Sequence, residues 1–443
     1  MGLGNKNFIS KLKLHSALWC VVAILVGCGQ THSDITVKNE ELKTDVMDEY
    51  EGVDEIDTAL EDSITTVTDM TDAEAVTDTE HMADEDALGE ELDETEEEEI
   101  PDTVNIRMVG DILLHTGVET SACDEEGGYN FDAIFANTKE YIEAADLAIV
   151  NEEVILGGEE LGISGYPCFN GPYEVAEALS NAGFDVVCHA TNHALDKGKQ
   201  GLLNTIGNWD NYNDMEAIGI HESEEDSKEI YITEINGIKI AVLNYTYGTN
   251  GIPLPSDMPY CVDLLEEDKV RSDIRLAEEN ADFTIVCPHW GTEYRLEKDS
   301  MQSKWTDIFF SEGVDLVIGT HPHVIEPYEM IEDENHKMLV YYSLGNFVNW
   351  TSGTGSGAGR RMVGGMADVT LGKNDSGEAF IEDYGVIALV THLDEGYGGV
   401  TTYSVADYTE ELGDANLMRN QDSEFDYHYV IDLCDSVWDS DWK

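Results

Sequence analysis

From residue 103 onward the chain alternates short apolar runs with longer segments of helical periodicity, and this alternation limits the fold more than any other feature. Residues 104–109, 147–150, 185–189 and 283–287 are typical of strands, and helical segments separate them. Strands that alternate with helices predict parallel pairing in an α/β fold. After residue 324 the pattern becomes mostly β, which predicts hairpins and sheets of mixed direction.

The N-terminus has the pattern of an export signal. Lys6, Lys11 and Lys13 precede an apolar run at residues 17–26, which is shorter than the ~20 residues that span a bilayer. The run ends in Leu25-Val26-Gly27-Cys28, which resembles a bacterial lipobox. We therefore predict that residues 1–28 are a lipoprotein signal peptide, that Cys28 is lipidated, and that the protein is extracytoplasmic and anchored to the cell membrane. An ordinary signal peptide and an uncleaved anchor are the alternatives.

Residues 29–102 are predicted to be a disordered acidic linker. No Lys or Arg occurs from Glu51 to Ile100, and Asp, Glu and Thr dominate. Such a segment buries too little apolar surface to offset the entropy of ordering, and its charges repel one another. The main interpretation is a solvated tether, and the alternative is a tail that collects cations. With 93 acidic and 23 basic residues, the chain carries a formal charge of −70, which argues against nucleic acid as a partner.

The remaining residues predict one large domain at 103–391 and a C-terminal appendage at 392–443. The length is sufficient for a single core, and no internal repeat is evident. Asn236-Gly237 separates two apolar runs and is the strongest short hairpin signal. The appendage is acidic and aromatic, and the sequence assigns it no role.

Polar residues follow five of the predicted strands at their carboxyl ends, where ligands bind in open α/β sheets. Together they predict a divalent-metal site of mixed oxygen and imidazole ligands, which suits one or two ions of Mn, Fe or Zn. Glu152 is the expected bridging carboxylate, and His193 is the expected proton donor to a leaving group. The predicted metal ligands are Asp111, Glu152, Asn192, His289, His321 and His323.

The same motifs, in the same order, resemble a known family. They are Gly110-Asp111, Asn151-Glu152, Thr191-Asn192-His193-Ala194-Leu195-Asp196, His289-Trp290-Gly291, Gly319-Thr320-His321-Pro322-His323 and Ser343-Leu344-Gly345-Asn346-Phe347. This set resembles the CapA/PgsA-type capsule-synthesis proteins, which are associated with poly-γ-glutamate. That family in turn resembles the calcineurin-like metallophosphoesterases. The resemblance implies a four-layered α/β/β/α sandwich and places the predicted ligands and His193 at metal and acid positions.

Three positions depart from the metallophosphoesterase pattern. Leu113 stands where that pattern has a histidine, and Glu152 stands where it has a bridging aspartate. Ala194, directly after His193, stands where the pattern has an acidic residue. His115 is the nearest alternative ligand. The departures bear on phosphatase activity more than on the fold.

Three further residues are candidates for substrate binding. Asn346 follows a strand and is expected to turn toward the site, although the motif is also compatible with a simple tight turn. Arg360 and Arg361 follow a glycine-rich loop in a very acidic chain, and arginine receives phosphate or carboxylate through paired N–H groups. Most such loops are only connectors.

Two main classes of function remain open from the sequence, and a lipoprotein that only binds a ligand is a weaker third. The first is a cell-surface protein of capsule synthesis or export, with the capsule polymer or its synthesis complex as partner. The second is a secreted metal-dependent hydrolase that acts on a phosphoester, so that an enzymatic role stays undecided at this point.

Overall fold

A computed structural model describes residues 103–440 and Trp442. The predicted signal peptide, the lipidation of Cys28 and the acidic linker lie outside these residues. Within the described part of the chain, no helix combines the length and the apolar character that a bilayer crossing needs.

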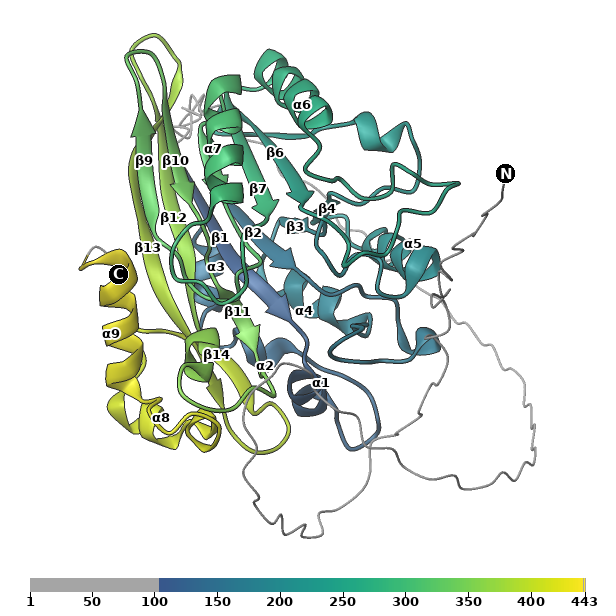
Figure 1. The fold of residues 1–443 in the computed structure, drawn as a ribbon, viewed down its shortest axis with the longest axis vertical. Helices are drawn as coiled ribbons and strands as arrows, with labels where there is room; N and C mark the ends of the chain where they lie inside the picture. Colours follow the sequence, from purple (N-terminus) through teal and green to yellow (C-terminus); the bar gives the residue numbers. More distant parts are fainter. Residues whose placement is uncertain (1–102, 441, 443) are drawn as a thin grey trace, which may run out of the picture. The chain divides into compact units, whose positions relative to one another are not determined.

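The described residues form two β-sheets of mixed strand direction (Figure 1). The first sheet has eight strands in the order β14-β13-β12-β1-β2-β3-β4, with β11 also paired to β1. Strands β1 to β4 and β11 pair with one another in parallel, whereas β12 pairs antiparallel with both β1 and β13, and β14 pairs antiparallel with β13. These strands are β1 (Val104–Leu113), β2 (Leu147–Glu152), β3 (Val186–Cys188), β4 (Glu216–Ile218), β11 (Asn346–Asn349), β12 (Val363–Lys373), β13 (Ala379–Leu393) and β14 (Val400–Ser404).

The second sheet has six strands in the order β5-β6-β7-β8-β10-β9. Its β5–β6 hairpin turns at Asn236 and Gly237, which both have positive φ, so the predicted hairpin is confirmed. The strands are β5 (Tyr231–Ile235), β6 (Ile238–Thr246), β7 (Phe283–His289), β8 (Leu316–Ile318), β9 (Tyr328–Glu332) and β10 (Lys337–Tyr341).

Alternating side chains of the second sheet face two different cores. Ile240 of β6 joins the large core that the two sheets share, whereas Ala241 packs in a second core with helices α6 and α7. Contact between the sheets is direct, since the sulfur atoms of Met108 on β1 and Cys287 on β7 lie 3.6 Å apart. The helices are α1 (Thr116–Ala122), α2 (Asp132–Phe135), α3 (Lys139–Glu143), α4 (Glu174–Ala182), α5 (Gly198–Trp209), α6 (Glu267–Asn280), α7 (Ser300–Glu312), α8 (Glu410–Ala415) and α9 (Tyr427–Trp438).

The sequence of residues 131–144 predicts a single helix, but the structure does not contain one. The structure breaks this segment into α2 and α3. Between them, the buried Thr138 hydroxyl lies 3.0 Å from the Thr402 hydroxyl of β14 and donates to the Phe135 carbonyl. Such local hydrogen bonds compete with helical ones, and their partner on β14 is a tertiary feature that local periodicity does not reveal.

The C-terminal residues continue the first sheet. β14 pairs with β13, and α9 lies along β13 (Figure 1). The indole N–H of Trp438 on α9 donates to the carbonyl of Glu326, which follows the His321-Pro322-His323 turn. The region that the sequence left without a role is therefore packed against the strands and turns of the domain.

A close backbone crossing lies where β1 meets the turn before β11. The amide of Asp111 donates to the carbonyl of Gly345, and a Cβ on Gly110 would lie 1.9 Å from that carbonyl oxygen. Only glycine permits this approach.

We predict that Gly110→Ala destabilises the protein by about 3 kcal/mol or more, because backbone atoms must move to relieve the clash. The matched control is Gly207→Ala in α5, where no atom lies within 4 Å of the added methyl group. It should be neutral or stabilising by ~0.5–1 kcal/mol. Denaturant unfolding measures both, and equal stabilities would contradict the crossing.

Glu119 on α1 is a buried carboxyl whose Oε1 has no hydrogen-bond partner among the described residues. Burial raises its pKa to about 8 from the ordinary 4.5, and Lys197 opposes this only partly. Since the folded pKa is the higher one, this stabilising contribution is complete below pH 4.5. It is lost as the pH rises toward 8.

Glu119→Gln should therefore gain stability relative to the wild type as the pH rises from 5 to 8. The expected slope is about 1.4 kcal/mol per pH unit, because one pKa unit corresponds to that free energy. Urea unfolding of both proteins at pH 5, 6.5 and 8 measures the difference. A difference that does not change with pH would show that Glu119 is ionised throughout.

Candidate metal centre

Five strand ends bring their polar residues to one place. Asp111 lies near the end of β1, and His289 is the last residue of β7. Glu153 follows β2 directly, while Asn192 and the His321-Pro322-His323 turn follow β3 and β8 by a few residues. The convergence that the sequence predicted at the carboxyl ends is thus present in the fold.

Glu153 is at the middle of the cluster. It is fully buried, and neither of its carboxyl oxygens has a hydrogen-bond partner among the described residues. Its Oε1 instead faces three imidazoles, at 3.7 Å from His289 Nε2, 3.6 Å from His323 Nε2 and 3.9 Å from His193 Nε2. Burial raises the pKa of this carboxyl well above its ordinary value. A carboxyl with such a raised pKa stays protonated unless a positive charge lies beside it, so its ionised form requires a compensating cation.

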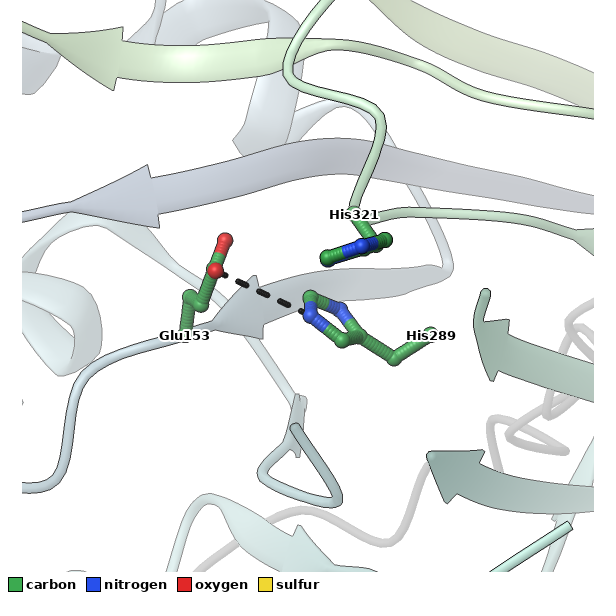
Figure 2. Close-up of side chains that lie close together, drawn as sticks. All are labelled: Glu153, His289 and His321. Carbon is green, nitrogen blue, oxygen red and sulfur yellow. Dashed lines mark ion pairs between the residues drawn. The ribbon is translucent and has the colours of Figure 1, made fainter. Parts of the chain in front are cut away.

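One side of the cluster combines Glu153, His289 and His321 (Figure 2), whose ligand atoms lie within 4.8 Å of one another. His289 Nδ1 is 3.0 Å from the Thr320 hydroxyl, which orients the ring, and its Nε2 is 2.9 Å from Asn192 Oδ1. His321 Nδ1 is buried without a partner among the described residues. Burial lowers the pKa of both histidines well below the ordinary value, which keeps them neutral, as metal ligands must be.

The other side combines Asp111, Glu153 and His323, again within 4.8 Å. His323 Nδ1 lies 3.3 Å from Asp111 Oδ2 and 3.1 Å from Asn346 Oδ1. Burial alone would lower the pKa of His323. The carboxylates of Glu153 and Asp111 outweigh it and raise the pKa to about 9 when no cation shares the site.

The His321-Pro322-His323 turn is held in an unusual conformation. His321 and His323 have φ angles of 97° and 57°, a region that few residues other than glycine occupy. Such strain costs ~1–3 kcal/mol and persists where surrounding contacts impose it. Here the backbone amide of His321 lies 3.3 Å from both oxygens of Asp111, and the Pro322 carbonyl accepts from the amide of Tyr294.

His193 is oriented by a carboxylate. Its Nδ1 lies 2.7 Å from Asp196 Oδ2, which also accepts from the amide of Phe169. Asn250 contacts both His193 and Asn192, at 3.3 Å each. With Nδ1 engaged, Nε2 is the nitrogen that faces Glu153. Asp196 and Asn250 were not singled out from the sequence, although Asp196 lies three residues after His193 in the same motif.

Glu153, and not the expected Glu152, is the glutamate that lies among the candidate ligands. Successive residues of a strand point to opposite sides, and Asn151 points toward the centre, where it donates to Asp111. Glu153 shares that side, whereas Oε1 of Glu152 accepts from the amide of Val154. Glu152 belongs to neither group of candidate ligands. The sequence shows two adjacent glutamates, but it does not show which of the two points toward the centre.

The structure places the remaining candidate residues in different surroundings. Asn346 is buried and donates to the carbonyls of His323 and Arg361, so it holds the backbone beside the centre. Arg361 lies over the ring of Tyr294, whereas Arg360 is exposed and lies beside Tyr429. His115 belongs to neither ligand group, and burial, His323 and Arg361 lower its pKa to about 4.

Exposed tyrosines border the centre. The Tyr247 ring lies 4.7 Å from that of His321, and the Tyr294 ring lies 6.1 Å from that of His323. Both tyrosines are about 40% exposed, so the molecular surface beside these two histidines is partly aromatic. Their loops carry no motif that marks them in the sequence.

The donor set fits a cation. Two three-residue groups share one carboxylate, the shared oxygens lack hydrogen bonds, and an imidazole nitrogen is buried beside them without a partner among the described residues. The molecule is thus a mixed α/β protein whose two sheets carry a buried carboxylate–histidine centre suited to one or two divalent ions.

Sequence comparison identifies the family of this protein. The model of the bacterial capsule synthesis protein PGA_cap matches residues 105–351, more than half of the chain. The chain belongs to this family.

Two curated relatives carry the name CapA. The PGA biosynthesis protein CapA of Bacillus subtilis (strain 168) is 29% identical over 272 residues, 56% of this chain and 65% of the relative. The capsule biosynthesis protein CapA of Bacillus anthracis is 27% identical over 260 residues, 56% of this chain and 61% of the relative. The chain therefore spans less than two thirds of the length of either relative.

Solved structures are similar at a greater distance. A 5'-nucleotidase precursor from Thermus thermophilus is 12% identical, with a TM-score of 0.41, over 65% of this chain and 54% of the other. The NAD nucleotidase NadN of Haemophilus influenzae is 11% identical, with a TM-score of 0.41, over 77% and 57%.

We predict that Glu153→Gln lowers metal affinity at least about 100-fold, above the 10–100-fold typical of residues that only support a ligand. The shared carboxylate is then lost from both ligand groups. Glu152→Gln is the matched control, because it makes the same chemical change one residue away and should retain the metal. Elemental analysis of the two purified proteins measures the effect. Equal metal contents would contradict the assignment of Glu153.

Proposed function

We propose that this protein is a cell-surface component of capsule synthesis or export, acting on poly-γ-glutamate or its synthesis complex, and that its metal centre is required for this role. Family membership supports the capsule context. The observation that carries the proposal is the buried Glu153, whose oxygens lack hydrogen bonds from the described residues amid three imidazoles.

We infer a four-layered α/β/β/α arrangement of the metallophosphoesterase type, and one or two ions of Mn, Fe or Zn. Asp111, Glu153 and His323 would hold one ion, and Glu153, His289, His321 with Asn192 the other. A bound divalent ion supplies Lewis acidity and lowers the pKa of water toward neutrality.

The protein's own residues then divide the remaining tasks. Thr320 and Asn346 orient His289 and His323, which fixes the nitrogen that each ring presents. The buried walls around Glu153 exclude bulk water and strengthen the electrostatic interactions inside.

A secreted metal-dependent phosphoesterase is the second candidate. The His193–Asp196 pair favours it, because a carboxylate on Nδ1 leaves Nε2 positioned to transfer a proton. In that case His193 is the catalytic acid, and the strand-end ligands keep the same roles.

For the location, we propose that lipidation at Cys28 anchors the protein outside the cytoplasm and that residues 29–102 connect this anchor with the rest of the chain. Neither proposal depends on the metal centre. Labelling with a radioactive fatty acid, with Cys28→Ser as control, tests the anchor.

Replacing the gene in its own host by the Glu153→Gln form should reduce capsule polymer as strongly as deletion of the gene, whereas Glu152→Gln should retain it. Polymer is measured by γ-glutamyl content of the cell surface. Full polymer in the Glu153→Gln strain would contradict the need for the centre.

A parallel assay with bis-p-nitrophenyl phosphate and added Mn separates the two candidates. Turnover that disappears in His193→Ala supports the hydrolase, and its absence with Mn, Fe and Zn alike favours a role without phosphoester hydrolysis.

A further inference from the structure

The glycine-rich loop at residues 351–361 is held by the C-terminal part of the chain. Asp422, which is buried, accepts from the amides of both Gly357 and Gly359 through Oδ2, at 2.8 and 3.0 Å. The side chain of Gln421 donates to the carbonyls of Thr351 and Gly353. Backbone polar groups at the start and at the end of the loop are therefore satisfied by two consecutive C-terminal residues.

Packing adds to these hydrogen bonds. The fully buried ring of Phe425 lies against Gly359, where an added Cβ would come within 2.6 Å of it. The amide of Gly355 also donates to the Gln421 carbonyl. A loop that contains four glycines would lose much conformational entropy on ordering, so the C-terminal contacts determine its single conformation.

Arg361 is the residue that this loop delivers to the metal centre. Its guanidinium lies 3.9 Å from the centroid of the Tyr294 ring, and its Nη1 donates to the Thr351 hydroxyl at 2.8 Å. Tyr294 in turn neighbours His323, and the backbone carbonyl of Arg361 accepts from Asn346, which orients His323. The positive charge therefore lies at the border of the centre.

Most N–H donors of the Arg361 side chain have no acceptor among the described residues. Among the described residues no carboxylate forms an ion pair with it, and the bond to Thr351 is the one hydrogen bond that its side chain donates. A guanidinium carries five N–H donors. In a chain with 93 acidic residues against 23 basic ones, a half-buried arginine without a carboxylate partner among the described residues is notable. The contact with the Tyr294 ring and the hydrogen bond to Thr351 hold the guanidinium in place, and its other N–H groups are available to an oxyanion.

Arg360 provides the contrast within the same turn. It is exposed and lies beside Tyr429 on α9, where it partly offsets the rise in the pKa of that phenol that burial causes. The two adjacent arginines thus have different surroundings, and only Arg361 borders the centre.

We propose that Arg361, held in place by Gln421, Asp422 and Phe425, binds a carboxylate or phosphate group of the ligand that occupies the metal centre. This inference rests on the proposed metal centre. It gives the C-terminal segment a function, which is to position an anion-binding arginine, with Asp422 as a positioning residue.

The test is calorimetric titration of the metal-loaded full-length protein with two probes, inorganic phosphate and tri-γ-glutamate. Arg361→Ala should weaken binding about ten- to hundredfold, because a charge-assisted pair contributes ~1.5–3 kcal/mol. Arg360→Ala is the matched control and should bind as the wild type does. A loss confined to tri-γ-glutamate identifies a carboxylate as the group bound, and a loss confined to phosphate identifies a phosphate.

Asp422→Ala tests the positioning role. It should weaken the same probe several-fold while the metal content stays unchanged, and Asp422→Asn, which keeps one acceptor oxygen, should restore most of the affinity. Asp426→Ala controls for general destabilisation, because Asp426 caps α9 through the amide of Tyr429 and, within the described part of the chain, forms no hydrogen bond with the loop. Equal losses in Asp422→Ala and Asp426→Ala would overturn the positioning role.

Metal content measured on the same samples distinguishes a failure of the proposed function from a failure of the inference about Arg361. A wild-type protein that binds no metal contradicts the proposed function. A metal-loaded wild type that binds neither probe, or an Arg361→Ala protein that binds as tightly as Arg360→Ala, overturns the inference about Arg361 alone.

Discussion

A carboxylate withdrawn from water is the constraint on which this structure depends most. Glu153 is fully buried without hydrogen bonds to either oxygen from the described residues. Burying such a group is costly unless positive charge compensates it. Glu153 and His193 follow strands of the first sheet, whereas His289 and His323 belong to strand ends of the second, so the electrostatic balance of one side chain couples the two sheets.

Close backbone packing makes that convergence possible. Gly110 approaches the Gly345 carbonyl more closely than any side chain would permit, which places Asp111 beside His323. On the other side, the buried Asn244 of β6 accepts from the amide of Ala190 after β3 and donates to the Cys287 carbonyl of β7. One amide side chain therefore links the first sheet to the second next to the centre, and a buried polar link of this kind requires both partners.

The C-terminal segment extends the architecture beyond the region that the family model matches, which ends at residue 351. β14 completes the first sheet, Trp438 binds the segment after His323, and Asp422 holds the loop of Arg361. Residues far apart in the chain thus support the same border of the centre. The C-terminal residues 392–443, to which the sequence assigns no role, pack beside the segment that carries His321 and His323.

The sequence by itself determined the α/β class, most strands, the hairpin at Asn236, and the strand ends that converge, because periodicity and turn residues are local properties. Only the tertiary structure decided that Glu153 rather than Glu152 faces the histidines, since the phase of a buried strand depends on which side meets the other sheet. The opposite surroundings of Arg360 and Arg361 likewise follow from packing against distant residues. Local patterns indicate which groups carry the chemistry, whereas orientation is set by contacts that the chain makes only when folded.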